Sequence, residues 1–128
     1  MDNDAIADLF SSLGPVSIRR MFGGKGIYHN GVIFAIEIRG ELMLKADAET
    51  APALAAAGSK QWIYAHARNG TSVAMPYWTV PDEAIDDPEE MGDWARQAYA
   101  AGMRAARSGE RPAPPAKAAS DRRKTVRP

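Results

Sequence analysis

The glycine-rich run Gly23-Gly24-Lys25-Gly26 is the first feature of the chain whose residue types suit a chemical role. Such a run can cradle a phosphate group, but a P-loop needs the pattern GxxxxGK followed by Ser or Thr and then a helix. Here Ile27 follows, and the next residues have the composition of a strand. The run therefore predicts a tight turn or bulge between two strands and no phosphate site.

Two arginines, Arg19 and Arg20, directly precede this turn. Neighbouring residues of a strand point to opposite faces of the sheet. We therefore expect one arginine to be solvated, and the other to pack against a carboxylate or to bind an anion or a partner. A structural or solvated role is the commoner one for such residues, since most surface ion pairs contribute little to stability.

Residues for catalysis or metal binding are sparse. The chain has no Cys, which excludes disulfides, thiolate metal sites and cysteine nucleophiles. Its two histidines, His29 and His66, are expected near hairpin turns and make a poor metal set. No serine lies in a GxSxG context, and the carboxylates between Asp82 and Asp93 are expected to cap a helix. The sequence predicts no catalytic residue, no cofactor and no metal ion.

The aromatic run Met75-Pro76-Tyr77-Trp78, together with Trp62, is a second candidate for recognition. Trp, Tyr and Met are common in binding hot spots, but they also fill cores, which is the role that we expect for most of them here. Tyr77 and Trp78 point to opposite faces of their strand, which leaves open that one of them is exposed. Pro76 lacks an N–H group for the ladder, so its strand is expected to be an edge or to end there.

The composition is that of one soluble domain followed by a basic tail. The 128 residues include 45% hydrophobic and 25% charged residues, with 16 charges of each sign. Up to Ser108 there are 10 basic and 14 acidic residues, whereas residues 109–128 hold six basic residues, two acidic residues and four prolines. We therefore expect a folded domain at residues 1–108 and a disordered basic tail at residues 109–128.

No apolar run approaches the length of about 18 residues that a membrane span needs. The N-terminal region is acidic and has no apolar stretch typical of a signal peptide. The absence of Cys fits a reducing compartment. The expected location is therefore the cytoplasm.

The elements that must position these residues begin with a helix. Asp2 or Asp4 can cap its start, and Gly14-Pro15 is expected to end it. Residues 16–46 are then predicted to form antiparallel strands. The apolar stripe of the helix consists of Ile6, Leu9, Phe10 and Leu13.

Asn30-Gly31 is a strong signal for a two-residue hairpin turn. This turn would pair His29 with Val32 and Ile27 with Phe34. The strand after the turn would then carry one apolar face, made of Val32, Phe34, Ile36 and Ile38.

The next turn has two alternatives. A two-residue turn at Arg39-Gly40 would place Ile36 opposite Met43 and separate the apolar rows. A three-residue loop at residues 39–41 would pair Ile38 with Leu42 and Ile36 with Leu44. Because register follows the buried face, we predict the longer loop.

A short alanine-rich helix is predicted at residues 51–57 and is closed by Gly58. A second hairpin follows, with a two-residue turn at Asn69-Gly70. This register gives an aromatic stripe on one face. Its pairs would be His66 with Val73, Tyr64 with Met75, and Trp62 with Tyr77.

The last predicted element is a long helix that begins with Asp87 as its cap and Pro88 at its first position. Its buried stripe consists mostly of small residues, which let a helix lie close to a sheet. The stripe contains Met91, Trp94, Ala95, Ala98, Gly102 and Ala105. Helices combined with short-looped antiparallel strands indicate an α+β class, a two-layer α/β sandwich with an antiparallel sheet.

Several of these blocks together resemble the N-terminal domain of TfoX/Sxy-type competence regulators. The most specific blocks are Arg19-Arg20-Met21-Phe22-Gly23-Gly24 and Met75-Pro76-Tyr77-Trp78. The others are Gly14-Pro15-Val16, Gly26-Ile27-Tyr28, residues 31–35, residues 42–45, Val80-Pro81, Asp87-Pro88-Glu89-Glu90 and Trp94-Ala95. The resemblance covers roughly residues 3–107. It implies a two-layer fold with an α-β-β-β-α-β-β-α-like order.

The resemblance also implies a non-enzymatic role in bacteria. Full-length members of that family are positive regulators of DNA-uptake genes that help the cyclic-AMP receptor protein at certain promoters. They carry a second domain, where this sequence has the basic tail at residues 109–128. The leading hypothesis is therefore a small regulatory or protein-interaction module.

The expected partner is another protein, such as a transcription factor or a polymerase component. The alternative is an accessory protein that binds nucleic acid through the basic tail with Arg19 and Arg20, although the tail lacks aromatics that would stack on bases. An enzyme or a small-ligand binder is a third, less favoured hypothesis. A homodimer is left open, and no membrane partner is expected.

The candidate interaction surface is centred on the turn between the first strands. A Gly-Gly turn exposes backbone, and Arg and aromatic side chains are enriched in interface hot spots. Its predicted members are Arg19, Arg20, Phe22, Gly23, Gly24 and Trp78.

Overall fold

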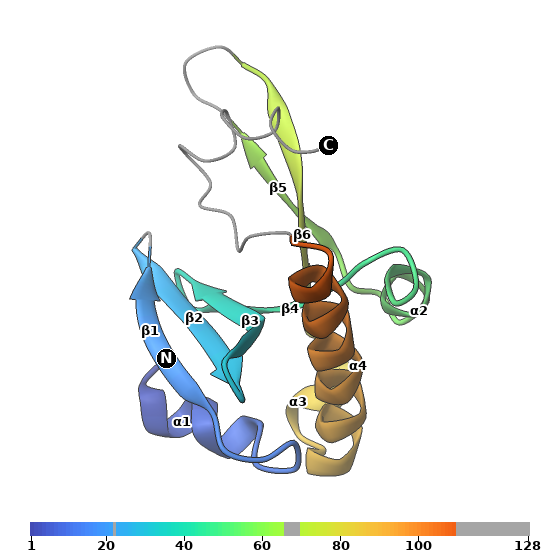
Figure 1. Cartoon of the computed structure of the whole chain (residues 1–128). Coiled ribbons are helices and arrows are strands. Elements are labelled where there is room, and N and C mark those ends of the chain that lie inside the picture. Colours follow the sequence, from blue (N-terminus) through green and yellow to red (C-terminus); the bar gives the residue numbers. More distant parts are fainter. Residues whose placement is uncertain (22, 66–69, 110–128) are drawn as a thin grey trace.

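The computed structural model describes residues 1–21, 23–65 and 70–109, and Figure 1 shows how their elements are arranged. The α+β class is confirmed. The structure has two elements more than the expected order: a fourth strand before the alanine-rich helix, and a short helix before the long last helix. The elements are α1 (Asn3–Leu9), β1 (Ser17–Met21), β2 (Gly24–His29), β3 (Val32–Ile38), β4 (Glu41–Lys45), α2 (Ala51–Ala56), β5 (Gln61–Ala65), β6 (Ser72–Thr79), α3 (Asp82–Ile85) and α4 (Pro88–Arg107).

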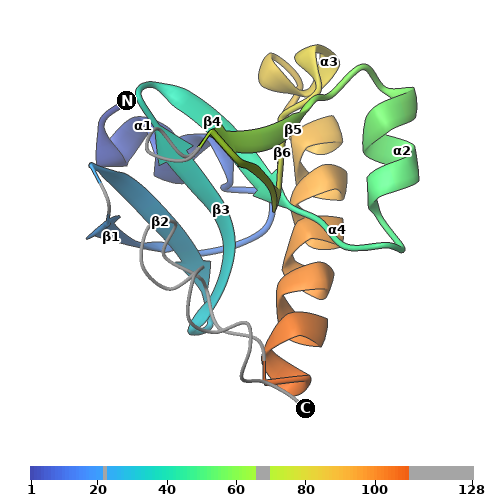
Figure 2. The same cartoon turned by 90° about the horizontal axis from the view of Figure 1, so that it is seen from above.

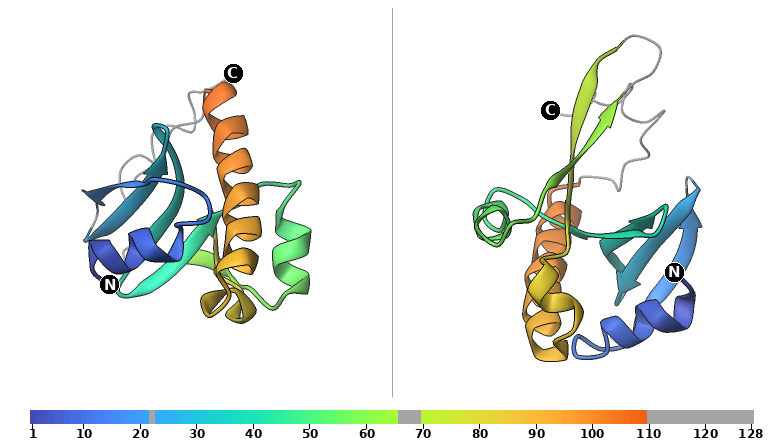
Figure 3. Two further views of the ribbon diagram at one scale, coloured as in Figure 1. Left: turned by 90° about the horizontal axis from the view of Figure 1, so that it is seen from below. Right: turned by 180° about the vertical axis from the view of Figure 1, so that it is seen from behind.

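The strands form one antiparallel six-stranded sheet with the order β1-β2-β3-β4-β6-β5. The edges of the sheet are therefore β1 and β5. In Figure 1 the β5–β6 hairpin extends above the rest of the molecule, away from α1 and α3. Figures 2 and 3 show α4 standing between the β1–β3 half of the sheet and α2.

Apolar side chains cover both faces of the sheet. The first core lies between the sheet and the helices α1 and α4. In this core the rings of Phe10 and Phe34 pack edge to face, with 4.9 Å between their centroids. The second core lies on the opposite face and consists of strand residues. Its buried members are Ile33, Ile36, Met43, Met75 and Tyr77.

The turn between β3 and β4 differs from the prediction. Arg39 and Gly40 form a two-residue turn with φ angles of 52° and 84°, and Ile38 lies opposite Glu41. Ile36 therefore lies opposite Met43, and the predicted three-residue loop is wrong. The prediction assumed one buried face, but both faces are covered here, so either register buries apolar residues.

The Asn30-Gly31 turn is confirmed, and His29 lies opposite Val32 as predicted. Ile27, however, lies opposite Ala35, because Phe34 is the extra residue of a β-bulge. The bulge also divides the predicted single apolar face of this strand. Phe34 belongs to the first core, whereas Ile36 and Ile38 belong to the second.

The β5–β6 hairpin follows the predicted register at its base, where Gln61 lies opposite Trp78, but the register shifts between Gln61 and Ile63. Beyond the shift, Tyr64 lies opposite Val73 rather than Met75. His66 and Asn69 of the predicted turn lie outside the described residues. The aromatic stripe itself is confirmed, because Trp62, Tyr64 and Tyr77 all lie on the second core.

Pro76 was expected on an edge strand or at a strand end, but β6 lies inside the sheet between β4 and β5. The β5 ladder shifts its register between Gln61 and Ile63, close to Pro76. On the other side, the Pro76 carbonyl accepts a hydrogen bond of 3.0 Å from the Ala46 N–H. The irregular ladder therefore accommodates a residue that has no N–H group.

The helix signals are largely confirmed. The Asp2 side chain caps α1 by accepting from the Ala5 N–H at 2.8 Å, although α1 ends at Leu9, earlier than expected. Asp87 caps α4 by accepting from two backbone N–H groups. The predicted stripe of α4 is buried as far as Gly102, and Ala105 is half-buried.

Candidate functional site

Arg19 and Arg20 lie on β1, an edge strand, and both side chains are exposed. Their neighbours define the faces, because Ile18 packs against the first core and Met21 against the second. The alternation of a strand therefore places Arg20 on the face of the first core and Arg19 on the other face, as the sequence predicts. The Arg19 guanidinium lies over the Tyr28 ring, 4.9 Å from its centroid.

Arg20 lies directly opposite Lys25 of β2, which places two positive charges across from each other. Like charges in this position repel. Lys25 Nζ donates a hydrogen bond of 2.6 Å to the Met1 carbonyl oxygen. Within the described part of the chain, no carboxylate forms an ion pair with Arg19 or Arg20.

Glu37 of β3 is the acidic residue in the same cross-strand row, opposite Lys25. Its carboxylate is buried and accepts a hydrogen bond of 2.8 Å from the Gly40 N–H. The same carboxylate lies 3.5 Å from the Met1 amino group. Glu37 is therefore bound into the β3–β4 turn and leaves the exposed guanidinium of Arg20 without a carboxylate.

Gly23 of the β1–β2 turn and Gly24, the first residue of β2, have different structural roles. Gly23 has a φ of 77°, which favours glycine, and a Cβ there would meet open space. A Cβ on Gly24 would clash with the backbone carbonyl of Glu37 and with the side chain of Ile38. The start of β2 is therefore packed closely against β3. Of the run predicted to form a turn or bulge, only Gly23 lies in the turn, and Gly24, Lys25 and Gly26 belong to β2. Phe22 lies outside the described residues, and its role at this surface stays a prediction.

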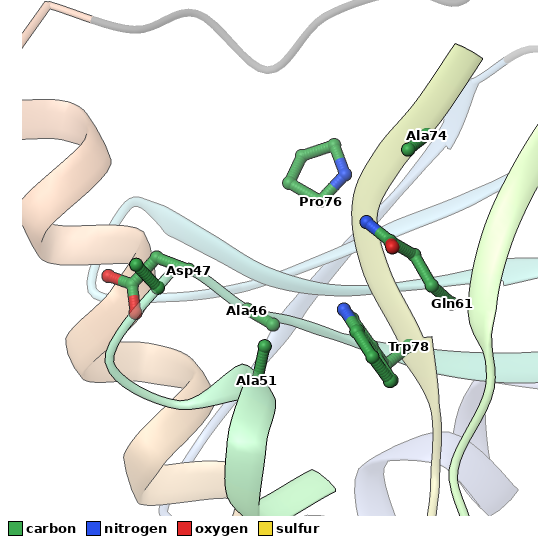
Figure 4. A pocket seen from close by; sticks show the side chains of 8 residues that line it. Ala46, Asp47, Ala51, Gln61, Ala74, Pro76 and Trp78 are labelled. Carbon is green, nitrogen blue, oxygen red and sulfur yellow. The ribbon is translucent and has the colours of Figure 1, made fainter. Parts of the chain in front are cut away.

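Trp78 does not lie with the other predicted members of the surface. It belongs to β6, which is separated from β1 by three strands, and it packs against the first core. Trp78 lines an open pocket of about 450 Å³ beside α2, shown in Figure 4. The other residues of this pocket are Ala46, Asp47, Ala48, Ala51, Gln61, Ala74 and Pro76.

The carboxylate in this pocket, Asp47, is held by Arg104 of α4. Its oxygens accept hydrogen bonds from Arg104 Nε at 2.7 Å and Nη2 at 3.1 Å, and it also accepts from the Glu49 and Thr50 N–H groups. The Arg104 guanidinium holds the pKa of Asp47 below its usual value, although burial acts in the opposite direction. Asp47 also raises the pKa of Arg104. This pair joins α4 to the loop before α2.

Neither Asp47 nor Arg104 is singled out by the sequence. They are separated by 57 residues, and no local pattern connects a loop aspartate with one arginine of a distant helix. Asp47 itself is a turn signal, because an Asp side chain often accepts a hydrogen bond from the backbone N–H two residues ahead. That signal predicts the Glu49 contact but not the ion pair.

Among the described residues, His29 and two of the carboxylates between Asp82 and Asp93 have structural roles. His29 Nδ1 donates to the Pro15 carbonyl at 2.7 Å, and its ring packs edge to face on Tyr99. Among the carboxylates of residues 82–93, Asp87 caps α4 and Glu90 accepts from Trp94 Nε1 at 3.0 Å. In the described parts of the chain, no three potential metal ligands come together. No helix described here is long and apolar enough to cross a bilayer.

Comparison with known proteins gives one family match. The family model of the TfoX N-terminal domain matches residues 8–102. No curated protein matches the chain. The matched segment runs from α1 to α4 and includes every strand of the sheet. The chain therefore belongs to the TfoX N-terminal domain family.

Proposed function

We propose that this domain is a small, non-enzymatic regulatory module that binds another protein through the β1 edge. The β1 edge is here the edge strand β1 with its exposed Arg19 and Arg20, together with Gly23 of the following turn and Gly24 at the start of β2. The observation that carries the proposal is the pair of exposed arginines on an edge strand, which have no carboxylate partner among the described residues.

The physical chemistry of this edge suits a protein partner. An edge strand presents unpaired backbone N–H and C=O groups to its surroundings. Arginine is enriched at interface hot spots, because its planar guanidinium forms several directed hydrogen bonds. Gly23 has no side chain and faces open space, so a partner can approach the backbone of the turn.

The two described groups with clearly shifted pKa values, Asp47 and Arg104, have a structural role. Strongly shifted pKa values often mark catalytic sites. Among the described residues, the pKa of Asp47 is lowered and that of Arg104 is raised, and the two groups bind each other in a contact between elements of the fold. A role in transcription regulation or competence rests on the resemblance to full-length family members and is the finer part of the proposal.

A charge-reversal experiment tests the β1 edge. Arg19→Glu/Arg20→Glu should leave the fold intact, since an exposed charge change typically alters stability by about 0.5 kcal/mol. The full chain and the variant are used as bait in extract of the native cell, and the captured proteins are quantified. The variant should lose the specific partner while its melting curve stays that of the parent.

Lys60→Glu is the matched control, because Lys60 is exposed and precedes β5 at the other end of the sheet. This control should retain the partner. Undiminished capture by the double variant would contradict the proposed surface. If a single-stranded oligonucleotide is retained by the parent and lost from the double variant, with no protein lost, the alternative of nucleic-acid binding replaces the proposal.

A further inference from the structure

The β1 edge has a strand geometry that a partner could extend. β1 pairs with β2 on one side, and no strand of the described residues pairs with it on the other. In an antiparallel pair, every second residue directs its N–H and C=O groups away from its neighbour. Figure 1 shows β1 at the outer margin of the sheet. An extended segment of a partner can therefore hydrogen-bond to β1 as a seventh strand.

The side chains of β1 define what such a strand must carry. Ile18 is half-buried on the first core, and Met21 is half-buried on the second. An added strand continues both faces of the sheet, so apolar residues opposite Ile18 and Met21 would extend the two cores. Between these positions, Arg19 and Arg20 are exposed on opposite faces.

Charge complementarity favours acidic residues at the two central positions of the added strand, opposite Arg19 and Arg20. An acidic residue opposite Arg20 would offset the repulsion between Arg20 and Lys25, which face each other across β1 and β2. A second acidic residue opposite Arg19 would lie on the other face of the sheet. Consecutive residues of one strand alternate between faces, so two adjacent acidic residues meet this requirement.

We propose that the β1 edge binds an extended peptide segment with the pattern apolar–acidic–acidic–apolar, added as a seventh strand of the sheet. This pattern reads the same in both directions, so it applies to a parallel or an antiparallel strand. The inference rests on the proposed function and names the chemistry of the partner.

The same charges work against pairing with a second copy of the chain. Two β1 strands aligned on the pattern Ile18-Arg19-Arg20-Met21 would bring arginine opposite arginine on both faces. Charged residues on an edge strand suppress such self-association in natural sheets. The edge therefore discriminates between its own copies and an acidic strand.

The test uses three capped hexapeptides and the full chain labelled with ¹⁵N. The peptides are Thr-Val-Glu-Glu-Val-Thr, its Gln-Gln form and its Lys-Lys form. At low ionic strength, the Glu-Glu peptide should bind about tenfold more tightly than the Gln-Gln peptide, and the Lys-Lys peptide should bind most weakly. The amide signals that shift should be those of residues 17–21, and the outward amides of β1 should exchange more slowly with solvent.

The variant Arg19→Glu/Arg20→Glu gives the sharpest arm of the test. Its preference should invert, so that the Lys-Lys peptide binds more tightly than the Glu-Glu peptide, while Lys60→Glu keeps the preference of the parent. A partner that is bound only through a side-chain patch would not slow the exchange of β1 amides.

Equal affinity for the three peptides, or signal shifts away from β1, would overturn the strand addition. The absence of binding by every peptide at millimolar concentration would overturn it too. If the arginine double variant still loses its cellular partner in such a case, the proposed function stands and only the strand addition fails. If partner capture is also unchanged, both proposals fail.

Discussion

Gly102 of α4 is the position at which the close approach of helix and sheet can be tested by one added methyl group. A Cβ on Gly102 would clash with the Ile33 carbonyl oxygen and would lie 2.9 Å from Val32 Cγ1. The carbonyl belongs to the backbone of β3, a strand paired on both sides. It therefore cannot move away as the end of a flexible side chain could.

Two effects of opposite sign act in the variant Gly102→Ala. Alanine favours a helix interior over glycine by about 1 kcal/mol. Forcing an extra carbon into a packed contact typically costs about 1–3 kcal/mol, and the upper part of that range applies because the obstacle is backbone. We therefore expect Gly102→Ala to lower the free energy of unfolding by about 1–2 kcal/mol.

Urea unfolding followed by far-ultraviolet circular dichroism measures this change, provided that parent and variant have the same m-value. Ala106→Gly is the control, because Ala106 is exposed on the same helix and reports the propensity effect in isolation. That control should lose up to about 1 kcal/mol. If Gly102→Ala instead gains the amount that the control loses, α4 does not lie against β3 as described.

Three further results are expected. Trp94→Ala should lose about 3–5 kcal/mol of unfolding free energy in the same urea assay, because a buried indole is replaced by a cavity; an unchanged stability would contradict its place in the first core. The lowered pKa of Asp47 means that its bond with Arg104 stabilises the fold above the unfolded carboxyl pKa and is lost as the pH falls through the folded pKa. Unfolding measured against pH should therefore show that Asp47→Asn is less stable than the parent near neutral pH, with the difference shrinking below about pH 4; a constant difference would exclude this linkage. Removal of residues 109–128, most of which lie outside the described residues, should leave the melting temperature nearly unchanged, whereas a drop of many degrees would place the tail within the folded unit.

The parts of the fold that the sequence predicts are those with local causes. Asp87 followed by Pro88 marks the start of α4, because a carboxylate cap and a fixed φ both act within one turn. Asn30-Gly31 marks its turn, because both residues adopt positive φ angles of 49° and 79°. The buried stripe of α4 is also predicted by a local pattern, because its small residues repeat with the period of the helix.

The errors arise where non-local packing decides. The Arg39-Gly40 register depends on whether the second face of the sheet is covered. The prediction assumed one buried face, although the unbroken apolar runs at residues 32–36 and 42–44 are typical of strands buried on both faces. The place of β6 inside the sheet likewise follows from its pairing with β4, across an intervening helix and strand. Strand order is a long-range property, so Pro76 misleads a prediction from local chemistry.

The candidate site shows the same division. Arg19, Arg20 and the glycine turn are adjacent in the sequence, and the structure places them together on one edge. Residue type groups Trp78 with them, but the strand order puts three strands between β1 and the strand of Trp78, which lies beside α2. Residue type alone therefore identifies candidates, and sheet topology decides which of them share a surface.

Hydrogen exchange of the full chain, free and bound to its cellular partner, tests the central claim most directly. If the β1 edge is the binding surface, the slowed amides will be those of β1, and the amides of β5 at the opposite edge will be unchanged. Protection confined to β5 or to the pocket around Trp78, with the amides of residues 17–21 exchanging as in the free chain, would contradict the account.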